Sequence, residues 1–342
     1  MQDLTTLHHA DDALHAHLRD ADGLAPGAAL RLLADAGLDR LPLPGHGATL
    51  ARWRALAAVG AHDLSLAKLF EGHTDALAIL HEAGADAPAH GSTWGTWCAE
   101  PPDARLRLRS TPGGAFVLDG RKAWCSGAAA VSHALVSCWN DAGEPMLAAV
   151  ALHQPGVRVT DEGWHAVGML ASGSVDVQFD GVPALPLGAP GFYVRRPGFW
   201  RGGAGVAACW FGAATTLAAA LRRRVQGQDD AHRLAQLGEV ARDLRGAAAT
   251  MREAAAAIDR DPQADAMALA LAVRLGVEAA ATRTLSAAGR ALGPGPMCKD
   301  ARLARLFADL PVFLRQSHAE RDLEALGRLA AAGDEGEAPW TL

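Results

Sequence analysis

Four side chains able to bind a metal ion stand at helical spacing close to the N-terminus. His8, Asp11, Asp12 and His15 occupy positions i, i+3, i+4 and i+7, so a helix would present them on one face. A helix face near a chain terminus is more often solvated than metal-bound, and the sequence contains no HExxH or comparable zinc signature. We therefore predict that the protein holds no metal.

The cysteines are odd in number and widely spaced, and no two form a Cys-x-x-Cys pair. They are Cys98, Cys125, Cys138, Cys209 and Cys298. This pattern indicates neither a disulfide framework nor a zinc site. The N-terminal stretch MQDLTTLHHADD carries acids and no apolar core, which is unlike a secretory signal. These features together predict a cytoplasmic protein with reduced thiols.

Three common catalytic or nucleotide-binding motifs are missing from the sequence. No glycine-rich turn joins a strand to a helix, because the nearest candidate, Gly202–Gly205, follows a loop. GxxxxGK[ST] and Gly-x-Ser-x-Gly are also absent. The sequence therefore argues against a Rossmann dehydrogenase, a P-loop nucleotidase and a serine hydrolase of the usual type.

Composition and charge point to a small-molecule partner. The chain has 342 residues, half of them apolar, which is enough to bury a large core. Its net charge of -6, from 32 Lys and Arg against 38 Asp and Glu, disfavours binding to nucleic acid or to an anionic membrane. The longest weakly polar run, Gly205–Leu221, is just short of a comfortable membrane span, and we expect a buried helix there.

The hydrophobic period changes twice along the chain. It is helical from Asp3 to about Ala83, and it becomes two over strands such as 105–109 and 175–180. It then returns to long Ala/Leu helices, expected at 203–226, 231–259, 262–289 and 300–331. The sequence predicts an α+β, mainly α fold, with an N-terminal helical domain (1–92), a central antiparallel β-barrel or sheet domain (93–190) and a C-terminal four-helix bundle (191–342).

Two segments of the sheet zone resemble motifs of the acyl-CoA dehydrogenase superfamily. Gly163–Pro183, GWHAVGMLASGSVDVQFDGVP, is similar to the family's "lGmrgs…s.v.Fd.V.vP" signature, and Asp119–Gly127, DGRKAWCSG, resembles its "G.K.wiTng" strand. Weaker similarities lie in the helical zones, at 33–44, 63–73, 205–214 and 299–302. The resemblance spans nearly the whole chain and implies the acyl-CoA dehydrogenase fold.

The resemblance implies a non-covalently bound FAD and the residues that would hold it. Trp124 and Ser126 match the family's Trp and Thr positions, an aromatic wall and a hydroxyl beside the flavin. The run 97–101 resembles the family's "TE.gaGSD" loop, which implies backbone contacts from Cys98 and Ala99 and a substrate contact from Glu100. The loop lacks the family's Thr and Gly-Ser-Asp. Trp124 could instead be a core aromatic residue of the sheet domain.

Two further positions follow from the resemblance. Arg233 is the nearest match to the arginine that meets the flavin pyrophosphate of a neighbouring subunit, although it is shifted by one residue. The alternative is a surface charge of a helix. His73 lies where the family's substrate cavity is lined, and its alternative is a core histidine with satisfied hydrogen bonds.

The catalytic base of the family has no direct match in this sequence. Many family members use a late Glu as the base, but Ala308 occupies that position here and the nearest acid is Asp309. Asp309 could instead form a helical ion pair with Arg305, four positions back. His318 could protonate an oxygen intermediate or bind substrate, as in flavin monooxygenases related by fold, or it could simply face Asp322 on a helix surface.

The resemblance implies an FAD-dependent oxidoreductase that oxidises the Cα–Cβ bond of an acyl thioester. Two alternatives remain open: a flavin-dependent monooxygenase or oxidase of the same fold, and a non-catalytic relative that binds flavin or acyl groups. The expected partners are a small acyl substrate and either an electron-transferring flavoprotein or a flavin reductase. A homodimer or homotetramer is also expected, because the family completes its flavin site across subunits.

Overall fold

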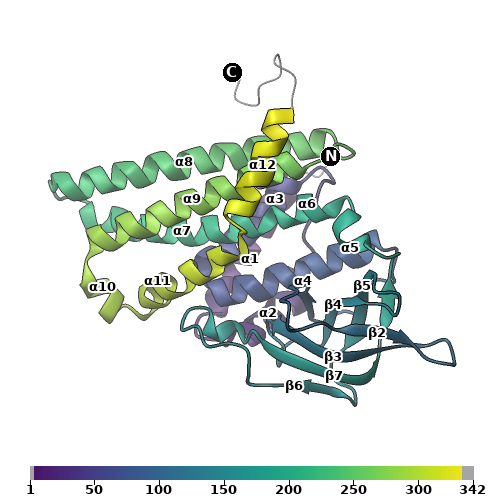
Figure 1. The fold of residues 1–342 in the computed structure, drawn as a ribbon. Coiled ribbons are helices and arrows are strands. Elements are labelled where there is room, and N and C mark those ends of the chain that lie inside the picture. Colours follow the sequence, from purple (N-terminus) through teal and green to yellow (C-terminus); the bar gives the residue numbers. More distant parts are fainter. Residues whose placement is uncertain (1–3, 333–342) are drawn as a thin grey trace. The chain divides into compact units, whose positions relative to one another are not determined.

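The computed structural model describes residues 4–332, and these residues form two compact units (Figure 1). The first unit comprises residues 4–44 and 63–199, and the second comprises residues 45–62 and 200–332. Each unit combines segments that are far apart in the sequence. The three-domain division expected from the sequence is a different partition, and it stays a prediction.

The first unit contains one curled sheet of eight strands. The strands are β1 (Trp94–Trp97), β2 (Arg107–Ser110), β3 (Phe116–Cys125), β4 (His133–Trp139), β5 (Pro145–Ala151), β6 (Val157–Val159), β7 (Val175–Pro183) and β8 (Leu185–Leu187). Their order is β6-β7-β3-β2-β4-β5-β8, with β1 paired to β4. Most pairs are antiparallel, as predicted, whereas β4 runs parallel to β1 and β2. The period of two in β7 buries Val177 and Phe179 and leaves Asp180 exposed.

Four α-helices of the described residues lie wholly within the first unit. They are α1 (Leu4–Asp20), α2 (Pro26–Asp35), α4 (Leu64–Glu82) and the short α5 (Phe192–Arg195). Asp63 caps α4, because its Oδ1 accepts a hydrogen bond from the Leu66 amide at 2.8 Å. Ile79 and Leu80 of α4 then pack with Trp94 and Leu135 of the sheet in one buried cluster. This contact fixes the helix that borders the candidate site.

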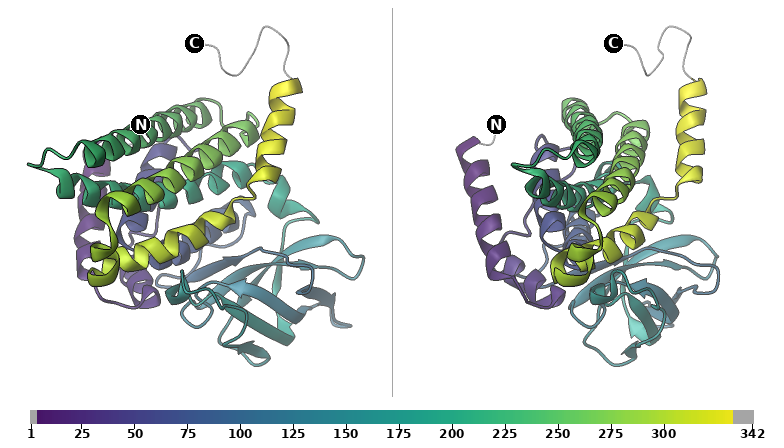
Figure 2. Two further views of the ribbon diagram at one scale, coloured as in Figure 1. Left: turned by 60° about the vertical axis from the view of Figure 1, so that its left-hand side comes forward. Right: turned by 90° about the vertical axis from the view of Figure 1, so that its left-hand side faces the viewer.

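The second unit is a bundle of helices. They are α3 (Thr49–His62), α7 (Gly205–Val225), α8 (Ala231–Arg260), α9 (Met267–Leu292), α10 (Pro294–Lys299), α11 (Ala301–Phe313) and α12 (Glu320–Ala332). The short α6 (Gly198–Gly203) lies at the boundary between the two units. Helices α8 and α9 run side by side for most of their length (Figure 2). The three long helices α7, α8 and α9 agree with the predicted ones to within a few residues, apart from the start of α9.

Glycines bring α3 and α7 into backbone contact. A Cβ atom added at Gly212 would lie 2.0 Å from the Ala57 carbonyl oxygen, and one added at Gly60 would lie 2.3 Å from the Cys209 carbonyl oxygen. No side chain fits at either position, so the two helices approach closely only because both residues are glycine. The segment Gly198–Val225, which includes α7, is apolar and long enough to span a membrane, but 72% of its most apolar window is buried. Such burial is typical of a core helix.

Asp259 of α8 fixes the start of α3. Its carboxylate accepts hydrogen bonds from the amides of Gly47 and Thr49, at 3.1 and 2.9 Å, and from the Thr49 hydroxyl at 2.6 Å. Thr49 is the first residue of α3, whose first amides have no partner within the helix, and Gly47 lies two residues before it. Helix α3 therefore joins the C-terminal helices, although the sequence order suggests an N-terminal domain.

The last predicted helix, 300–331, is wrong in one respect, because it is divided in two. Helix α11 ends at Phe313, two residues after Pro311, and the chain tightens into a 3₁₀ turn over Leu314–Gln316 before α12 begins. Proline supplies no amide hydrogen to the helix, which weakens the helical ladder at this point. Ala319 then adopts a left-handed φ of 44°, which completes the break.

Candidate functional site

The end of β3 presents an exposed tryptophan and a buried serine. Trp124 is 49% exposed and has a φ of 57°, an uncommon backbone conformation for a bulky residue. Two residues later, the Ser126 carbonyl accepts a hydrogen bond from the Trp97 indole at 3.0 Å, and its side chain is almost fully buried. The strand end thus has one aromatic face toward solvent and one hydroxyl directed inward.

A pocket lies between α4, β1 and the loop that follows β3. We call it the β1 pocket, and it is lined by Lys68, Leu69, Gly72, Trp94, Gly95, Thr96, Trp97, Ser126 and Val131. All of these residues belong to the first unit. Of the predicted site residues, the pocket includes Ser126 but not His73.

The side-chain hydrogen-bond donors that line the β1 pocket already have partners. Thr96 donates to the Gly72 carbonyl at 2.7 Å, and the Trp94 indole donates to the Ser92 hydroxyl at 3.1 Å. The Trp97 indole donates to the Ser126 carbonyl, and Lys68 also has an interaction partner. A hydroxyl that has given its hydrogen to another group retains only lone pairs for a ligand. The Thr96 oxygen therefore offers lone pairs to a ligand that donates hydrogen bonds, beside the Lys68 side chain.

The Ser126 hydroxyl also has a hydrogen-bond partner within the protein. Its hydroxyl lies 2.8 Å from that of Ser174, which in turn lies 2.8 Å from that of Ser172. Ser172 and Ser174 were not predicted as site residues, although both lie in the segment that resembles the family signature. The missing signal was the pairing of β3 with β7, which brings residues 48 positions apart into contact.

Glu100 faces the sheet, where its carboxylate has two partners. Its Oε2 accepts a hydrogen bond from the Trp139 indole at 3.1 Å, and its Oε1 lies 3.8 Å from the Lys122 ammonium. Lys122 is almost fully buried and donates to the carbonyl and the hydroxyl of Ser137. Burial lowers the pKa of Lys122. This arrangement is that of a structural ion pair, and the expected substrate contact of Glu100 stays a prediction.

Cys98 and Ala99 follow β1, beside the same lysine. Burial of the Cys98 thiol raises its pKa to about 11 despite the nearby Lys122 charge, so the thiol is protonated near neutral pH. Ala99 is exposed. The backbone contacts with a flavin that the resemblance implies for these two residues remain predictions.

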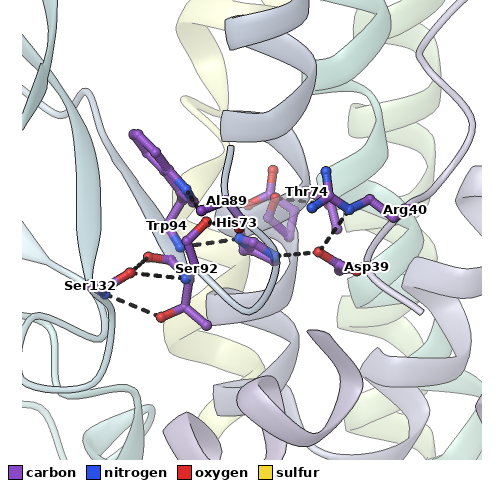
Figure 3. Close-up of polar contacts among 10 residues, drawn as sticks. Asp39, Arg40, His73, Thr74, Ala89, Ser92, Trp94 and Ser132 are labelled. Carbon is purple, nitrogen blue, oxygen red and sulfur yellow. Dashed lines mark hydrogen bonds and ion pairs between the residues drawn. The ribbon is translucent and has the colours of Figure 1, made fainter. Parts of the chain in front are cut away.

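His73 belongs to a buried polar cluster (Figure 3). Its Nδ1 accepts a hydrogen bond from the Trp94 amide at 3.1 Å, so Nε2 carries the hydrogen and donates to Oδ2 of Asp39 at 3.0 Å. The His73 side chain has no exposed surface. Both ring nitrogens are occupied by the protein, which favours the core histidine over the expected substrate contact.

Arg233 is held by its own helix and by the end of α9. Its Nε donates to the Ala291 carbonyl at 3.1 Å, and its Nη1 lies 3.2 Å from Oδ2 of Asp230, which also caps α8. The side chain is 31% exposed. These contacts occupy the guanidinium group that the resemblance assigns to a flavin pyrophosphate.

The two predicted catalytic residues differ in exposure. Asp309 of α11 is buried, at 4% exposed, and has an interaction partner. His318 lies in the break between α11 and α12, with its side chain 56% exposed and its Nδ1 3.4 Å from Oδ1 of Asp322. The contact between His318 and Asp322 is the one expected of a surface residue. Both belong to the second unit, and neither role has been tested.

Among the described residues, no group of three or more His, Cys, Asp or Glu side chains could hold a metal ion. His8, part of the N-terminal face considered above, lies outside the residues whose side chains are described. The residues predicted for the site are divided between the two units. The first unit contains Cys98, Ala99, Glu100, Trp124, Ser126 and His73, and the second contains Arg233, Asp309 and His318.

Comparison with known proteins gives partial matches in sequence. No protein-family model matches the chain. A segment is 42% identical over 106 residues to the amino sugar nitrososynthase DnmZ of Streptomyces peucetius. This match covers 28% of the chain and 26% of DnmZ, so it spans only about a quarter of that relative's length.

Solved structures match over nearly the whole chain. The dibenzothiophene monooxygenase TdsC of Paenibacillus sp. A11-2, in a complex with FMN and indole, has a TM-score of 0.80 at 19% identity over 94% of this chain and 96% of its own. KijD3, in a complex with FMN and a dTDP-linked 3-amino sugar, has a TM-score of 0.78 at 22% identity, over 96% and 92% of the two chains.

Butyryl-CoA dehydrogenase from Megasphaera elsdenii has a TM-score of 0.80 at 14% identity, over 96% of this chain and 99% of its own. At these low identities the likeness establishes the fold and not the activity. The order of helices, curled sheet and helices agrees with the order derived from the sequence. The chain has the acyl-CoA dehydrogenase fold, as a divergent example of it.

Proposed function

We propose that the protein is a flavin-dependent monooxygenase that oxidises an amino group of a small polar substrate, with sugar amines as the first class to test. The partial sequence match to an amino sugar nitrososynthase supports this proposal, as does the likeness to TdsC and KijD3. The first expectation, oxidation of an acyl thioester, is retained as the second candidate.

The observation that carries the proposal is the hydrogen-bonding character of the β1 pocket. Thr96 and Ser126 offer lone pairs to a ligand, because their hydrogens are given to Gly72 and Ser174. A thioester carbonyl accepts hydrogen bonds and needs donors for its activation. Amines and sugar hydroxyls bring their own donors. The Thr96 and Ser126 oxygens therefore suit an amine or a hydroxyl group better than a thioester carbonyl.

The residues at the end of β3 fit a flavin ring. A flavin needs a flat apolar surface for its ring and polar groups for the ring nitrogens and oxygens. Trp124 supplies an exposed aromatic face, and Leu170, in the turn that precedes Ser172, is 64% exposed. Ser126 supplies a lone pair. These are the side chains that would hold the ring.

FMN is the favoured form of the flavin, in place of the expected FAD. The longer cofactor carries a second phosphate, and Arg233, its expected partner, already contacts Asp230 and Ala291. TdsC and KijD3 were both solved with FMN. An FMN-dependent enzyme of this kind would receive reduced flavin from a separate flavin reductase.

The bound reduced flavin would supply two electrons to dioxygen, of which one atom enters the substrate amine and the other leaves as water. The protein's contribution is to orient the amine and to keep the ring out of water. Trp124 would cover the ring, and Thr96 and Ser126 would accept hydrogen bonds from N–H or O–H groups of the ligands.

Acyl-CoA dehydrogenation is favoured by one separate observation. Asp309 is a buried carboxylate one residue from the position at which related enzymes carry their base. A buried carboxylate in a dry site is a suitable base for an α-proton, provided that it can reach the substrate. This candidate predicts direct reduction of bound flavin by a thioester.

A two-arm experiment separates the candidates. The purified protein, loaded with FMN or FAD, is mixed without oxygen with a panel of acyl-CoA thioesters. In the second arm, FMN, a flavin reductase, NADH and oxygen are supplied with a panel of nucleotide-linked amino sugars, and products are analysed by mass spectrometry. Oxygenated amine with no bleaching by thioesters supports the monooxygenase. Bleaching by a thioester supports the dehydrogenase, and failure to bind either flavin supports the non-catalytic relative.

A further inference from the structure

Arg201 is a buried arginine of the second unit that has no ionic partner among the residues that the structure describes. The residue is 7% exposed, and its Nη2 donates a hydrogen bond to the Ala264 carbonyl at 3.1 Å. Its Nε is buried and makes no hydrogen bond within the described part of the chain. A guanidinium group carries a permanent charge and five N–H donors. Most of the binding capacity of Arg201 is therefore unused by the protein.

Arg196, in the first unit, shows how the same chain accommodates another buried guanidinium group. Arg196 is 4% exposed, with Nη1 2.7 Å from Oε2 of Glu82 and Nη2 3.5 Å from Oδ1 of Asp75. Burying an arginine without such carboxylates costs free energy, because the charge leaves water and gains no counter-charge. Arg201 has no carboxylate of this kind among the described residues. The second unit therefore contains a buried positive charge that an external anion could neutralise.

The loop before α3 packs against Arg201 without neutralising it. A Cβ atom added at Gly45 would lie 2.9 Å from Cδ of Arg201 and 3.4 and 3.5 Å from its Nη1 and Nε, so the guanidinium group lies beside a position without a side chain. The Gly45 amide donates to the Thr49 hydroxyl at 3.1 Å. Asp259, the carboxylate at the start of α3, accepts from Gly47 and Thr49 and forms no ion pair with Arg201. The charge of Arg201 is thus left unpaired by the neighbouring acid.

A second buried donor without a partner lies on the same side of the helix that carries Arg201. Trp53 of α3 is 1% exposed, and its indole Nε1 makes no hydrogen bond among the described residues. A Cβ atom added at Gly205 would lie 3.8 Å from this Nε1. Ala204, between α6 and α7, keeps helical dihedral angles (φ −64°, ψ −25°), so Arg201 and Gly205 lie one turn apart on one face. The guanidinium and the indole are therefore both unmet donors where α3 meets this face.

We propose that Arg201 is the centre of a binding site for a small oxyanion, a phosphate or carboxylate group, with the Trp53 indole as a second donor. An oxyanion supplies both the negative charge and the acceptor atoms that these side chains lack, and its hydrogen bonds to a guanidinium are charge-assisted. The 7% exposure of Arg201 leaves its surroundings open to a small group. The site does not depend on the proposed function, because its residues belong to the second unit and none of them lines the β1 pocket.

Thermal unfolding in the presence of anions tests the site. The unfolding midpoint of the wild-type protein is measured in titrations with inorganic phosphate, a nucleoside diphosphate and acetate, at constant ionic strength set with chloride. A ligand that binds only the folded protein should raise the midpoint by about 5 °C at about 100 times its dissociation constant. The oxyanion that acts at the lowest concentration distinguishes a free phosphate ion, a nucleotide phosphate and a carboxylate as the ligand.

Arg201→Met removes the charge and keeps much of the side-chain bulk. In chloride alone this variant should be at least as stable as the wild-type protein, because it no longer buries an unpaired charge. In the oxyanion it should lose the saturable rise in the midpoint. Trp53→Phe should weaken the apparent affinity by about three- to tenfold, the effect of one hydrogen bond. Arg222→Met, at an exposed position on α7, is the control and should respond as the wild-type protein does.

A saturable rise that Arg201→Met abolishes and Arg222→Met retains supports the oxyanion site. An equal rise in the wild-type and Arg201→Met proteins is a general effect of the salt on stability and overturns the site. A wild-type protein whose midpoint responds to none of the three oxyanions also overturns it. If Arg201→Met does not fold, Arg201→Lys replaces it, since it keeps the charge with fewer donors and should bind the oxyanion more weakly. Unchanged affinity in a folded Arg201→Lys variant then overturns the site.

Discussion

His73 and Asp39 form a buried pair in which the imidazole donates to the carboxylate over 3.0 Å. The side chains are 0% and 3% exposed, and the Trp94 amide occupies the other ring nitrogen. The pair therefore links the start of β1 to the segment that follows α2. His73 therefore helps to hold Trp94, which lines the β1 pocket, in place.

Replacing His73 by Ala should destabilise the protein by about 2–4 kcal/mol, because it leaves the buried Asp39 carboxylate without its donor. Urea denaturation measures the change in the free energy of unfolding. His165→Ala, at an exposed loop position, serves as the control and should have little effect. Unchanged stability with weaker substrate binding would instead support the substrate contact expected from the sequence.

Replacing Gly212 by Ala should destabilise the second unit by about 1–3 kcal/mol or more, because the new methyl group overlaps the Ala57 carbonyl oxygen of α3. Gly246→Ala is a matched control within α8, where nothing lies within 4 Å of the added atom. It should stabilise the protein by up to about 1 kcal/mol through helix propensity. Thermal unfolding of both variants checks the prediction, which fails if the two changes have the same sign.

The cysteines should react with alkylating reagents in a defined order. Cys298 is exposed and should be labelled first near neutral pH. Cys98, whose pKa burial raises from 9.0 to about 11, should react slowly until the pH approaches that value. Mass spectrometry of peptides after timed labelling measures the order. Rapid labelling of Cys98 near neutral pH would contradict the raised pKa of its thiol.

The same raised pKa of Cys98 predicts a loss of stability at high pH. Between 9.0 and about 11 the folded protein keeps the thiol proton that the unfolded chain has lost. The contribution is therefore complete below pH 9.0 and disappears as the pH rises through about 11. Cys98→Ala should make the fall in the free energy of unfolding less steep across this interval. An equally steep fall in the variant would exclude Cys98 as a contributor.

Replacing Trp124 by Ala should weaken FMN binding by about tenfold, because the ring loses its aromatic cover. Trp124→Phe should retain most of the affinity. Phe116→Ala is the matched control, since Phe116 is an exposed aromatic residue at the other end of β3. Fluorescence titration with FMN measures the affinities. Equal affinities for the wild-type and Trp124→Ala proteins would show that the flavin ring lies elsewhere.

The period of the apolar residues in the sequence was enough to predict most of the helices and strands. The alternation in β7 and the long apolar repeats of α7, α8 and α9 each depend on residues close together in the chain. The break after Phe313 was not predicted, although Pro311 and the polar run at 315–322 mark the position. The contact of Asp259 with the start of α3 could not be read from the sequence, because Asp259 is 210 residues away from Thr49.

The site was predictable only where a motif carried it. Trp124 and Ser126 came from the resemblance of Asp119–Gly127 to the family's strand motif. The hydrogen bond of the Ser126 hydroxyl is made with Ser174, 48 residues later in the chain. The Arg233 guanidinium donates to the carbonyl of Ala291, 58 residues later. Sequence patterns report residue types at short range. They do not report which hydroxyl gives its hydrogen to which acceptor.

Oxygen transfer to a substrate amine is the central claim, and isotopically labelled dioxygen tests it most directly. The FMN-loaded protein, a flavin reductase and NADH would be incubated with a nucleotide-linked amino sugar under the labelled gas, and the product would be weighed by mass spectrometry. We predict one labelled oxygen atom on the nitrogen-bearing product, dependent on both the protein and reduced FMN. An unlabelled product, or a flavin that is reduced by an acyl-CoA thioester in the absence of oxygen, would contradict the account.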